Sequence, residues 1–287
     1  MLTPLLLAPL RRFHDISFAN IVGFIWCFTY ALFVFCVNKK QGHRLSDVKI
    51  LLCLLIGVEF LIIPIYIVSF ENIKGSLMQT IACIFGVFSA YVCYKCFSKG
   101  RIIATAIGII CLSAAIWLSF EGERLWLNKI GFGSFTGRLA HAEFIPLRFQ
   151  TAIGDTVKIE DFRGKYLVLD VWFTYCGVCF QKFPRVQALY ERYKGNENIV
   201  IYSLHARMEE KDRWGWGGES YYTGAAIIKR EGYSFPTLSI CMNDPLLREE
   251  AGVQFFPTVL IFDKESRLIF RGSVEFAERY LRRRLRE

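Results

Sequence analysis

The sequence predicts an α-helical membrane domain followed by an α/β domain, in which helices flank a central mixed sheet. Two observations support this division. Of the 287 residues, 53% are hydrophobic and 16% aromatic, and the apolar excess lies almost entirely in the first 120 positions. From about residue 140, strand-like and helix-like patterns alternate. We place the membrane domain at residues 1–125, a linker at 126–142 and the α/β domain at 143–287.

Four apolar segments are long enough to cross a bilayer, which takes about 20 residues of helix. They lack the polar faces at helical spacing that core helices of a soluble protein would show. A secretory signal peptide would supply one short apolar core, not four. The predicted spans are residues 16–37, 48–70, 77–97 and 102–120.

Lysine and arginine residues near the spans predict the orientation of the chain. The loops after the first and third spans are basic, whereas the loop "ENIKGS" after the second holds a single lysine, Lys74. The N-terminus is then outside and, with four spans, so is the α/β domain. We therefore expect a multi-pass protein of the bacterial cytoplasmic membrane, with the lipid bilayer as a partner and the α/β domain in the periplasm or exterior.

The net charge of +9 is explained by these loops and by the basic tail "RYLRRRLRE". A nucleic-acid-binding protein would show a basic groove with interleaved stacking aromatics. The sequence shows no such pattern, so nucleic acid is not an expected partner.

The elements of the α/β domain follow from local patterns. A short strand and turn in "VKIEDFRGK" precede a central strand, "YLVLDVWF". Helical periodicity begins at "CGVCFQKFPRVQALYERYKG" and gives way to a strand, "NIVIYSLHA". An irregular stretch, a short helix near Ala225–Glu231 and a strand "FPTLSI" follow. A hairpin from "FFPTVLIFD" to "LIFRG" and a basic helix close the chain. This order indicates a sheet with a crossover connection.

Cys176 and Cys179 lie at the start of the first helix of this domain. A zinc site would need a second ligand pair, and the domain offers only Cys241, His141 and His205, so no metal is expected. A structural disulfide over so short a loop would add little stability. A thiolate at Cys176 would face the positive end of the helix dipole, which lowers its pKa and favours nucleophilic attack. Cys179, one turn inward, would then resolve the mixed disulfide.

Three features together resemble a known family. They are "DFRGKYLVLDVWFTYCGVC", Pro184 eight residues after Cys176, and "GVQFFPTVLIFDKESRLIFRG". In this order and spacing, residues 143–287 resemble the thioredoxin superfamily and, within it, the membrane-tethered TlpA/ResA-like thiol–disulfide oxidoreductases. The resemblance implies a thioredoxin-like fold, a redox-active Cys176–Cys179 disulfide and no cofactor. Its implied partners are disulfide-containing proteins and an electron donor or acceptor that the sequence does not identify.

The resemblance also implies roles for two residues near the cysteines. Asp170 matches a buried acid that accepts the proton of Cys179, and burial would raise its pKa; the alternative is an exposed aspartate at a strand end. Pro257, with Phe256 before it, matches the cis-proline that offers backbone atoms to an extended substrate. The alternative for Pro257 is an ordinary trans-proline at a strand start.

Two aromatic residues are expected to wall the site, Trp172 and Tyr175, although both could instead serve packing. One position departs from the family pattern, because Lys182 stands where ResA-like and cytochrome c maturation proteins carry a glutamate. A cation there would favour ionisation of the thiol, so haem maturation is not expected. The aromatic segment Trp214–Tyr222 is longer than a minimal thioredoxin needs; it is either a substrate-binding loop or an ordered insertion.

Seven of the ten cysteines lie in the predicted membrane domain, where most are expected to act as small apolar residues. Cys93 and Cys96, in "CYKC", are candidates for a relay that accepts electrons from cytoplasmic thioredoxin. Glu59 lies within the second predicted span, where a charge is costly. It would bind a quinone, carry a proton or make a helix contact.

The sequence thus predicts a membrane-anchored, extracytoplasmic thiol–disulfide oxidoreductase that reduces protein disulfides. One alternative is a thiol peroxidase of the peroxiredoxin type, whose Pro-x-x-x-Thr-x-x-Cys signature would use Thr174 but lacks its proline here. The other is a copper-binding chaperone module with Cys176, Cys179 and His205 as ligands.

Overall fold

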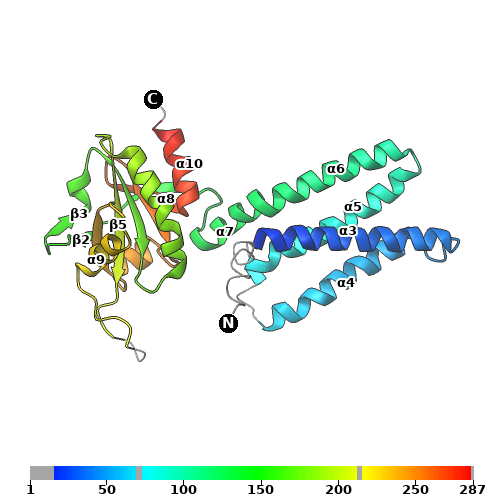
Figure 1. Ribbon diagram of the computed structural model, residues 1–287, viewed down its shortest axis with the longest axis horizontal. Coiled ribbons are helices and arrows are strands. Elements are labelled where there is room, and N and C mark those ends of the chain that lie inside the picture. The colour runs from blue at the N-terminus through cyan, green and yellow to red at the C-terminus, as the bar shows by residue number, and fades with distance from the viewer. Residues whose placement is uncertain (1–15, 69–72, 212–214, 286–287) are drawn as a thin grey trace. The chain divides into compact units, whose positions relative to one another are not determined.

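The computed structural model describes residues 16–68, 73–211 and 215–285. The chain divides into two compact units, residues 1–127 and 128–287. In the first unit four helices lie alongside one another, and α5 contacts α3, α4 and α6 (Figure 1). A π-helical turn, η2 (Leu118–Gly122), continues α6 into α7. The helices are α3 (Ile16–Lys40), α4 (Asp47–Val68), α5 (Ile73–Phe97), α6 (Arg101–Trp117) and α7 (Glu123–Phe132).

Within the described parts of the chain, three helical segments are long and apolar enough to cross a membrane: Asn20–Lys40, Leu77–Phe97 and Arg101–Phe132. They correspond to the first, third and fourth predicted spans. The second, residues 48–70, is helical as α4, but its last two residues and the side chains of 61–68 lie outside the described residues. The four-span arrangement therefore stays a prediction.

Close backbone contact joins α3 to α5. A Cβ atom added to Gly86 would lie 2.6 Å from the carbonyl oxygen of Phe24, so only glycine permits this approach. Further along the two helices, the Phe35 ring packs on Tyr91 and Tyr94, at centroid distances of 5.6 and 5.2 Å. Outward-facing side chains of the unit are large and apolar, with Trp26, Phe60 and Ile102 among them. Such a surface suits a hydrocarbon environment better than water.

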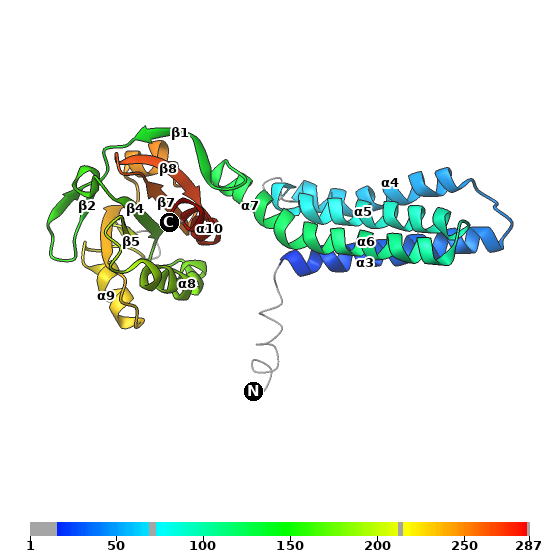
Figure 2. The ribbon, with the colours of Figure 1, turned by 90° about the horizontal axis from the view of Figure 1, so that it is seen from above.

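The second unit is built on an eight-stranded mixed sheet with the order β1-β8-β7-β4-β5-β6-β2-β3. Strands β4, β5 and β6 are parallel, and the remaining pairs are antiparallel. Figure 2 shows α8, α9 and α10 around the sheet. The strands are β1 (Arg138–Phe144), β2 (Arg148–Gln150), β3 (Thr156–Lys158), β4 (Tyr166–Trp172), β5 (Ile199–Arg207), β6 (Thr237–Cys241), β7 (Thr258–Phe262) and β8 (Arg267–Gly272); the helices are α8 (Gly177–Tyr193), α9 (Thr223–Arg230) and α10 (Val274–Arg284).

The central strand β4 is buried on both faces, as a strand covered on both sides should be. Leu167, Leu169 and Val171 join the main hydrophobic core. The alternate residues face the other way, where Trp172 packs on Phe183 of α8 at 5.0 Å between ring centroids. Asp170 shares this second face with Trp172. The predicted mixed sheet with flanking helices is confirmed.

Residues 126–142, treated above as a linker, are largely ordered. They contain the end of α7 and the start of β1, which pairs with β8 at the edge of the sheet. The amide of Asn128 reinforces this region, because it donates to the carbonyl of Ser134 (2.7 Å) and accepts from the backbone N–H of Ser273 (3.2 Å). An edge strand of this kind is specified by its distant partner, which local patterns do not reveal.

Candidate functional site

Cys176 and Cys179 form a disulfide at the junction of β4 and α8, with their Cα atoms 5.3 Å apart. Cys176 is the N-cap of α8, and its sulfur accepts the backbone N–H of Cys179 at 3.2 Å. The N-terminus of a helix offers free N–H groups and a positive dipole end, both of which favour a thiolate. Cys176 is 7% exposed, whereas Cys179 is fully buried. The exposed member is therefore the one that a second molecule can reach.

Asp170 is buried, with 3% of its surface exposed, so the alternative of an exposed aspartate is wrong. Neither carboxyl oxygen has a hydrogen-bond partner among the described residues. Burial, with a smaller contribution from the charge of Glu275, raises the pKa of Asp170 from 3.8 to about 7. A carboxyl group with this pKa can both bind and release a proton near neutral pH.

Pro257 follows a cis peptide bond with Phe256. The antiparallel register pairs Thr258 with Val171, which places Pro257 beside the end of β4, where the segment leading to Cys176 begins. The Phe256 ring packs against Phe173 in that segment, 5.0 Å between centroids. The alternative of a trans-proline is therefore wrong, and the proline segment adjoins the cysteine segment.

Lys182 does not act as an unpaired cation. Its ammonium donates to Glu275 of α10 at 2.7 Å, and Arg185 lies 3.6 Å from the same carboxylate. Burial, the largest single effect, opposes ionisation of Glu275, but the hydrogen bond and charge of Lys182, together with hydrogen bonds from the backbone and Ser273, lower the pKa of Glu275. The expected effect of Lys182 on thiol ionisation is thus offset by a carboxylate 93 residues away in the sequence.

Trp172 is not a wall of the site, because its side chain is fully buried. Its indole N–H donates to the hydroxyl of Ser203 (3.0 Å), and its ring packs on Phe180 and Phe183. Trp172 therefore belongs to the packing between β4 and α8. Tyr175 does border the site, since it precedes Cys176 directly and remains 40% exposed.

A buried polar cluster lies behind this segment, and the sequence analysis missed it. The Nε2 atom of His205 is 3.0 Å from the hydroxyl of Thr174 and 3.6 Å from a carboxylate oxygen of Glu219. Burial, with a smaller contribution from Arg207, lowers the pKa of His205 to about 4, so the imidazole is neutral at pH 7. No local pattern marks this cluster, because its members come from three separate segments.

The copper-ligand hypothesis for Cys176, Cys179 and His205 is not supported. Among the described residues, no group of three or more histidine, cysteine, aspartate or glutamate side chains is placed to hold a metal ion. His205 faces Thr174 and Glu219 instead, and the two cysteines are bonded to each other.

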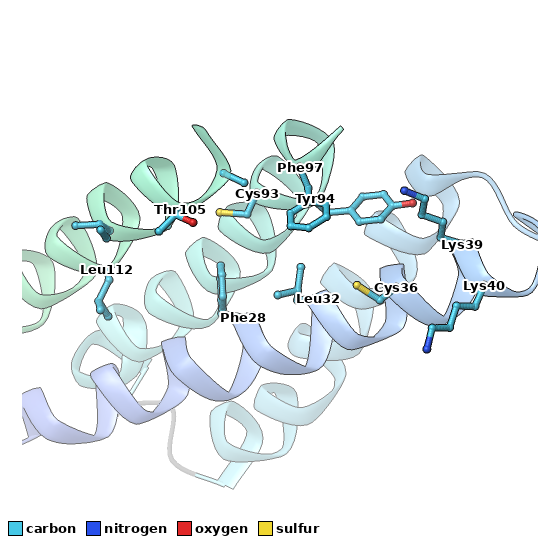
Figure 3. Close-up of a pocket in the computed structure, with 13 residues that line it drawn as sticks. Phe28, Leu32, Cys36, Lys39, Lys40, Cys93, Tyr94, Phe97, Thr105 and Leu112 are labelled. Atoms are coloured by element: carbon cyan, nitrogen blue, oxygen red, sulfur yellow. The ribbon is translucent and has the colours of Figure 1, made fainter. Parts of the chain in front are cut away.

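The candidate relay residues of the first unit lie in different settings. Cys93 lines a cavity of about 640 Å³ between α3, α5 and α6, whose wall is mainly apolar and whose border includes Lys39 and Lys40 (Figure 3). Cys96, one turn further along α5, does not line this cavity. Cys93 and Cys96 are both free thiols. Glu59 is exposed on α4 and lies outside the cavity wall.

No protein-family model matches the sequence. The chain is 25% identical over 117 residues to the thiol–disulfide oxidoreductase ResA of Halalkalibacterium halodurans, covering 40% of this chain and 58% of that protein. It is 26% identical over 172 residues to ResA of Bacillus cereus, covering 60% of this chain and 87% of that protein. The chain thus spans less than two thirds of the first of these relatives.

Solved structures also match about half of the chain. A thiol–disulfide oxidoreductase from Bacteroides fragilis is 19% identical, with a TM-score of 0.40, over 49% of this chain and 97% of its own. The exposed lipoprotein thioredoxin of Streptococcus pneumoniae is 19% identical, with a TM-score of 0.39, over 48% of this chain and 98% of its own. The ResA relatives confirm the resemblance that the sequence motifs indicate.

Proposed function

We propose that this chain, a ResA/TlpA-like protein of the thioredoxin superfamily, is a membrane-anchored thiol–disulfide oxidoreductase that reduces protein disulfides outside the cytoplasm. The observation that carries the proposal is the Cys176–Cys179 pair, with the more exposed sulfur at the N-terminus of α8. The ResA relatives support the reaction class. The three long apolar segments support anchoring in the bacterial cytoplasmic membrane.

In the proposed reaction, the thiolate of Cys176 attacks one sulfur of a substrate disulfide. The substrate S–S bond breaks, a bond between Cys176 and the substrate forms, and one substrate thiolate leaves and takes up a proton. Cys179 then loses its proton and attacks Cys176, which releases the second substrate thiol and leaves the Cys176–Cys179 disulfide. Two electrons pass to the substrate, and an external dithiol donor must restore the reduced pair.

Asp170 is the proposed acceptor of the Cys179 proton. Its carboxyl group has no competing hydrogen bond among the described residues, and its pKa of about 7 suits proton transfer at neutral pH. Pro257 and Phe256 are the proposed backbone contacts for an extended substrate segment, and their place beside the Cys176 segment supports this role. Such a contact would hold the substrate sulfur in line with Cys176.

A relay through the membrane unit is the proposed route to the donor. Cys93, which lines the cavity between helices, and Cys96 are its candidate thiols. Glu59 is the candidate proton carrier. For Glu59 the proposal rests on its position within an apolar helix, where an ionisable group is costly unless it serves a purpose.

Neither alternative function gains support. The ResA relatives are thiol–disulfide oxidoreductases rather than peroxidases, and the described residues offer no copper-ligand cluster. A peroxide-consumption assay on the purified protein tests the thiol peroxidase alternative, and Cu(I) titration tests the copper-binding alternative. We expect neither peroxide turnover nor stoichiometric Cu(I) binding that depends on His205.

The test of the proposed function is the reduction potential of the Cys176–Cys179 pair in the full chain in detergent micelles. The protein is equilibrated in thiol–disulfide buffers and the reduced fraction is read by alkylation and mass spectrometry of the peptide that holds both cysteines. A value near about −270 mV, like thioredoxin, is expected of a reductant. A value near about −120 mV would make the protein a disulfide donor and overturn the proposed direction of electron flow.

A further inference from the structure

The segment between β5 and α9, residues 208–222, is linked to the residues that precede Cys176 at two places, directly at Tyr175 and through His205 of β5 at Thr174. Of this segment the structure describes residues 208–211 and 215–222, and Trp214 lies outside the described residues. One contact is aromatic and faces solvent, and the other is polar and buried. Both reach the same three-residue stretch, which ends at Cys176.

The aromatic contact joins Trp216 to Tyr175. Their rings stack at 4.8 Å between centroids and 13° between planes, and the backbone N–H of Gly217 donates to the Tyr175 hydroxyl at 3.3 Å. Both side chains remain open to solvent, 40% for Tyr175 and 49% for Trp216. The pair therefore forms an exposed aromatic surface directly beside Cys176.

The path of the chain at this point depends on glycine. Gly217 has a φ of +103°, and an added Cβ would lie 2.1 Å from the carbonyl oxygen of Glu210. The segment is thus folded tightly on itself immediately after Trp216.

The polar contact holds the base of the segment. The carboxylate of Glu219 is 5% exposed and accepts the backbone N–H of Met208 at 2.7 Å, while its own N–H donates to the carbonyl of Met208 at 3.0 Å. The same carboxylate lies 3.6 Å from His205, which in turn contacts the hydroxyl of Thr174 at 3.0 Å. Glu219 therefore ties the segment both to itself and, through His205, to the residue next to Tyr175.

The surroundings of Cys176 match this arrangement. Val178, two residues after Cys176, is exposed, and so is Phe255, the neighbour of Phe256, whose ring packs on Phe173. Exposed apolar side chains on the segments that adjoin the proposed nucleophile favour a recognition surface over ordinary surface composition. An extended substrate segment that brings its disulfide to Cys176 would lay its neighbouring side chain on this surface.

We infer that Trp216 and Tyr175 form a specificity wall, which favours disulfides whose cysteine is flanked by an aromatic or branched apolar side chain. Glu219 is a positioning residue that holds Trp216 in place. The inference rests on the proposed function and deepens it, since it names the substrate class. The wall acts on binding, so the exchange of S–S bonds proceeds as described above.

The test uses the full chain in detergent micelles with the Cys176–Cys179 pair reduced. Three substrates are compared: two disulfide-linked peptides that differ only in phenylalanine or serine beside the cysteine, and glutathione disulfide. We expect about a tenfold higher kcat/KM for the phenylalanine peptide, which corresponds to about 1.4 kcal/mol of binding. Trp216→Ala should bring the ratio of the two peptides close to one, with the rate on glutathione disulfide within about twofold of the wild type.

Tyr222→Ala is the matched control, because Tyr222 is an exposed aromatic of the same segment that packs on Tyr221 rather than on Tyr175. It should keep the tenfold ratio. Glu219→Ala should lose the ratio as Trp216→Ala does, whereas Glu219→Gln, which retains an acceptor for the Met208 N–H, should keep most of it. Rescue by glutamine separates positioning from general loss of fold.

The possible results separate the specificity wall from the proposed oxidoreductase function. A wild-type protein that reduces both peptides at equal rates, or a Trp216→Ala variant that keeps the tenfold ratio, would overturn the specificity wall and leave the oxidoreductase intact. A wild-type protein that reduces none of the three disulfides would overturn the proposed function itself.

Discussion

The two units of the chain use cysteine in contrasting ways. In the first unit, the cysteines lie beyond the first turn of their helices, where the backbone N–H groups are already bonded within the helix; Cys27 and Cys83, for example, pack with the hydrophobic residues of α3 and α5. In the second unit, Cys176 is the N-cap of a helix and its sulfur accepts one of the first N–H groups, and the strand that precedes it carries the buried carboxyl group of Asp170. The comparison teaches that position relative to a helix terminus, rather than the number of thiols, marks the reactive cysteine.

The largest expected effect tests that contrast directly. Cys176→Ala should lower disulfide reduction by more than about a thousandfold, because the proposed nucleophile is lost. Cys93→Ala should leave the rate unchanged when dithiothreitol serves as donor, since the membrane unit is then bypassed. Turnover of a disulfide peptide measures both. A comparable loss in Cys93→Ala would break the distinction between the units.

The next prediction concerns the resolving cysteine. Cys179→Ala should accumulate mixed disulfides at Cys176, since no second thiol can release the bound substrate. Trapped complexes are detected on non-reducing gels and by mass spectrometry. Cys241→Ala is the matched control, because Cys241 is a free thiol of the same unit and should trap nothing. Absence of any trapped partner in Cys179→Ala would contradict the proposed order of attack.

The buried carboxyl group gives a prediction with a defined pH window. The folded protein retains a proton at Asp170 up to about pH 7, whereas the unfolded chain releases it near 3.8. This residue therefore lowers stability as the pH rises through that window, and the full penalty is present above pH 7. Asp170→Asn should remove the penalty, which is worth up to about 4 kcal/mol. Chemical denaturation at pH 4 and pH 8 measures the difference.

The same substitution should slow catalysis, which links stability to function at one residue. Without a proton acceptor near Cys179, resolution of the mixed disulfide should fall by about a hundredfold at pH 7. Stopped-flow release of a fluorescent substrate thiol measures this step. If Asp170→Asn raised the free energy of unfolding at pH 8 but left the rate of resolution unchanged, Asp170 would lower stability without serving as the proposed proton acceptor.

The smallest expected effect concerns Glu275. Its negative charge contributes to the raised pKa of Asp170, so Glu275→Gln should shift the pH dependence of resolution downward by less than about one unit. Glu278→Gln is a suitable control, because Glu278 lies one turn further along α10 and pairs with Arg185 and Arg282. If Glu275→Gln and Glu278→Gln shifted the pH dependence of resolution equally, long-range charge rather than the proximity of Glu275 would determine that pH dependence.

Elements with strong local patterns were predictable from the sequence. The strand "YLVLDVWF" and the helix after Cys176 correspond to β4 and α8, and the short helix near Ala225 corresponds to α9. The edge strand β1 and the three-residue strand β2 were missed, because their places in the sheet depend on hydrogen bonds to β8 and β6, far away in the sequence, rather than on their own composition.

Only the parts of the candidate site that lie within a sequence motif, such as Cys176, Cys179 and Pro257, were predictable from the sequence. Trp172 was misjudged as a wall residue, although it has the same strand parity as Asp170 and therefore points into the sheet–helix interface. The pairing of Lys182 with Glu275 and the contact between His205 and Glu219 join residues far apart in the sequence. No periodicity or spacing encodes such contacts.

The slight exposure of Cys176 also bears on which proteins in a cell envelope would be altered. Because only 7% of the Cys176 residue is exposed, a chain that can bend around it reaches it more readily than the rigid surface of a folded protein does. If the chain reduces protein disulfides as proposed, those in native cores would survive contact with it, while those in nascent or damaged chains would be opened. The limited exposure of Cys176 would then make the reaction selective, so that unfolded proteins are reduced and folded proteins are not.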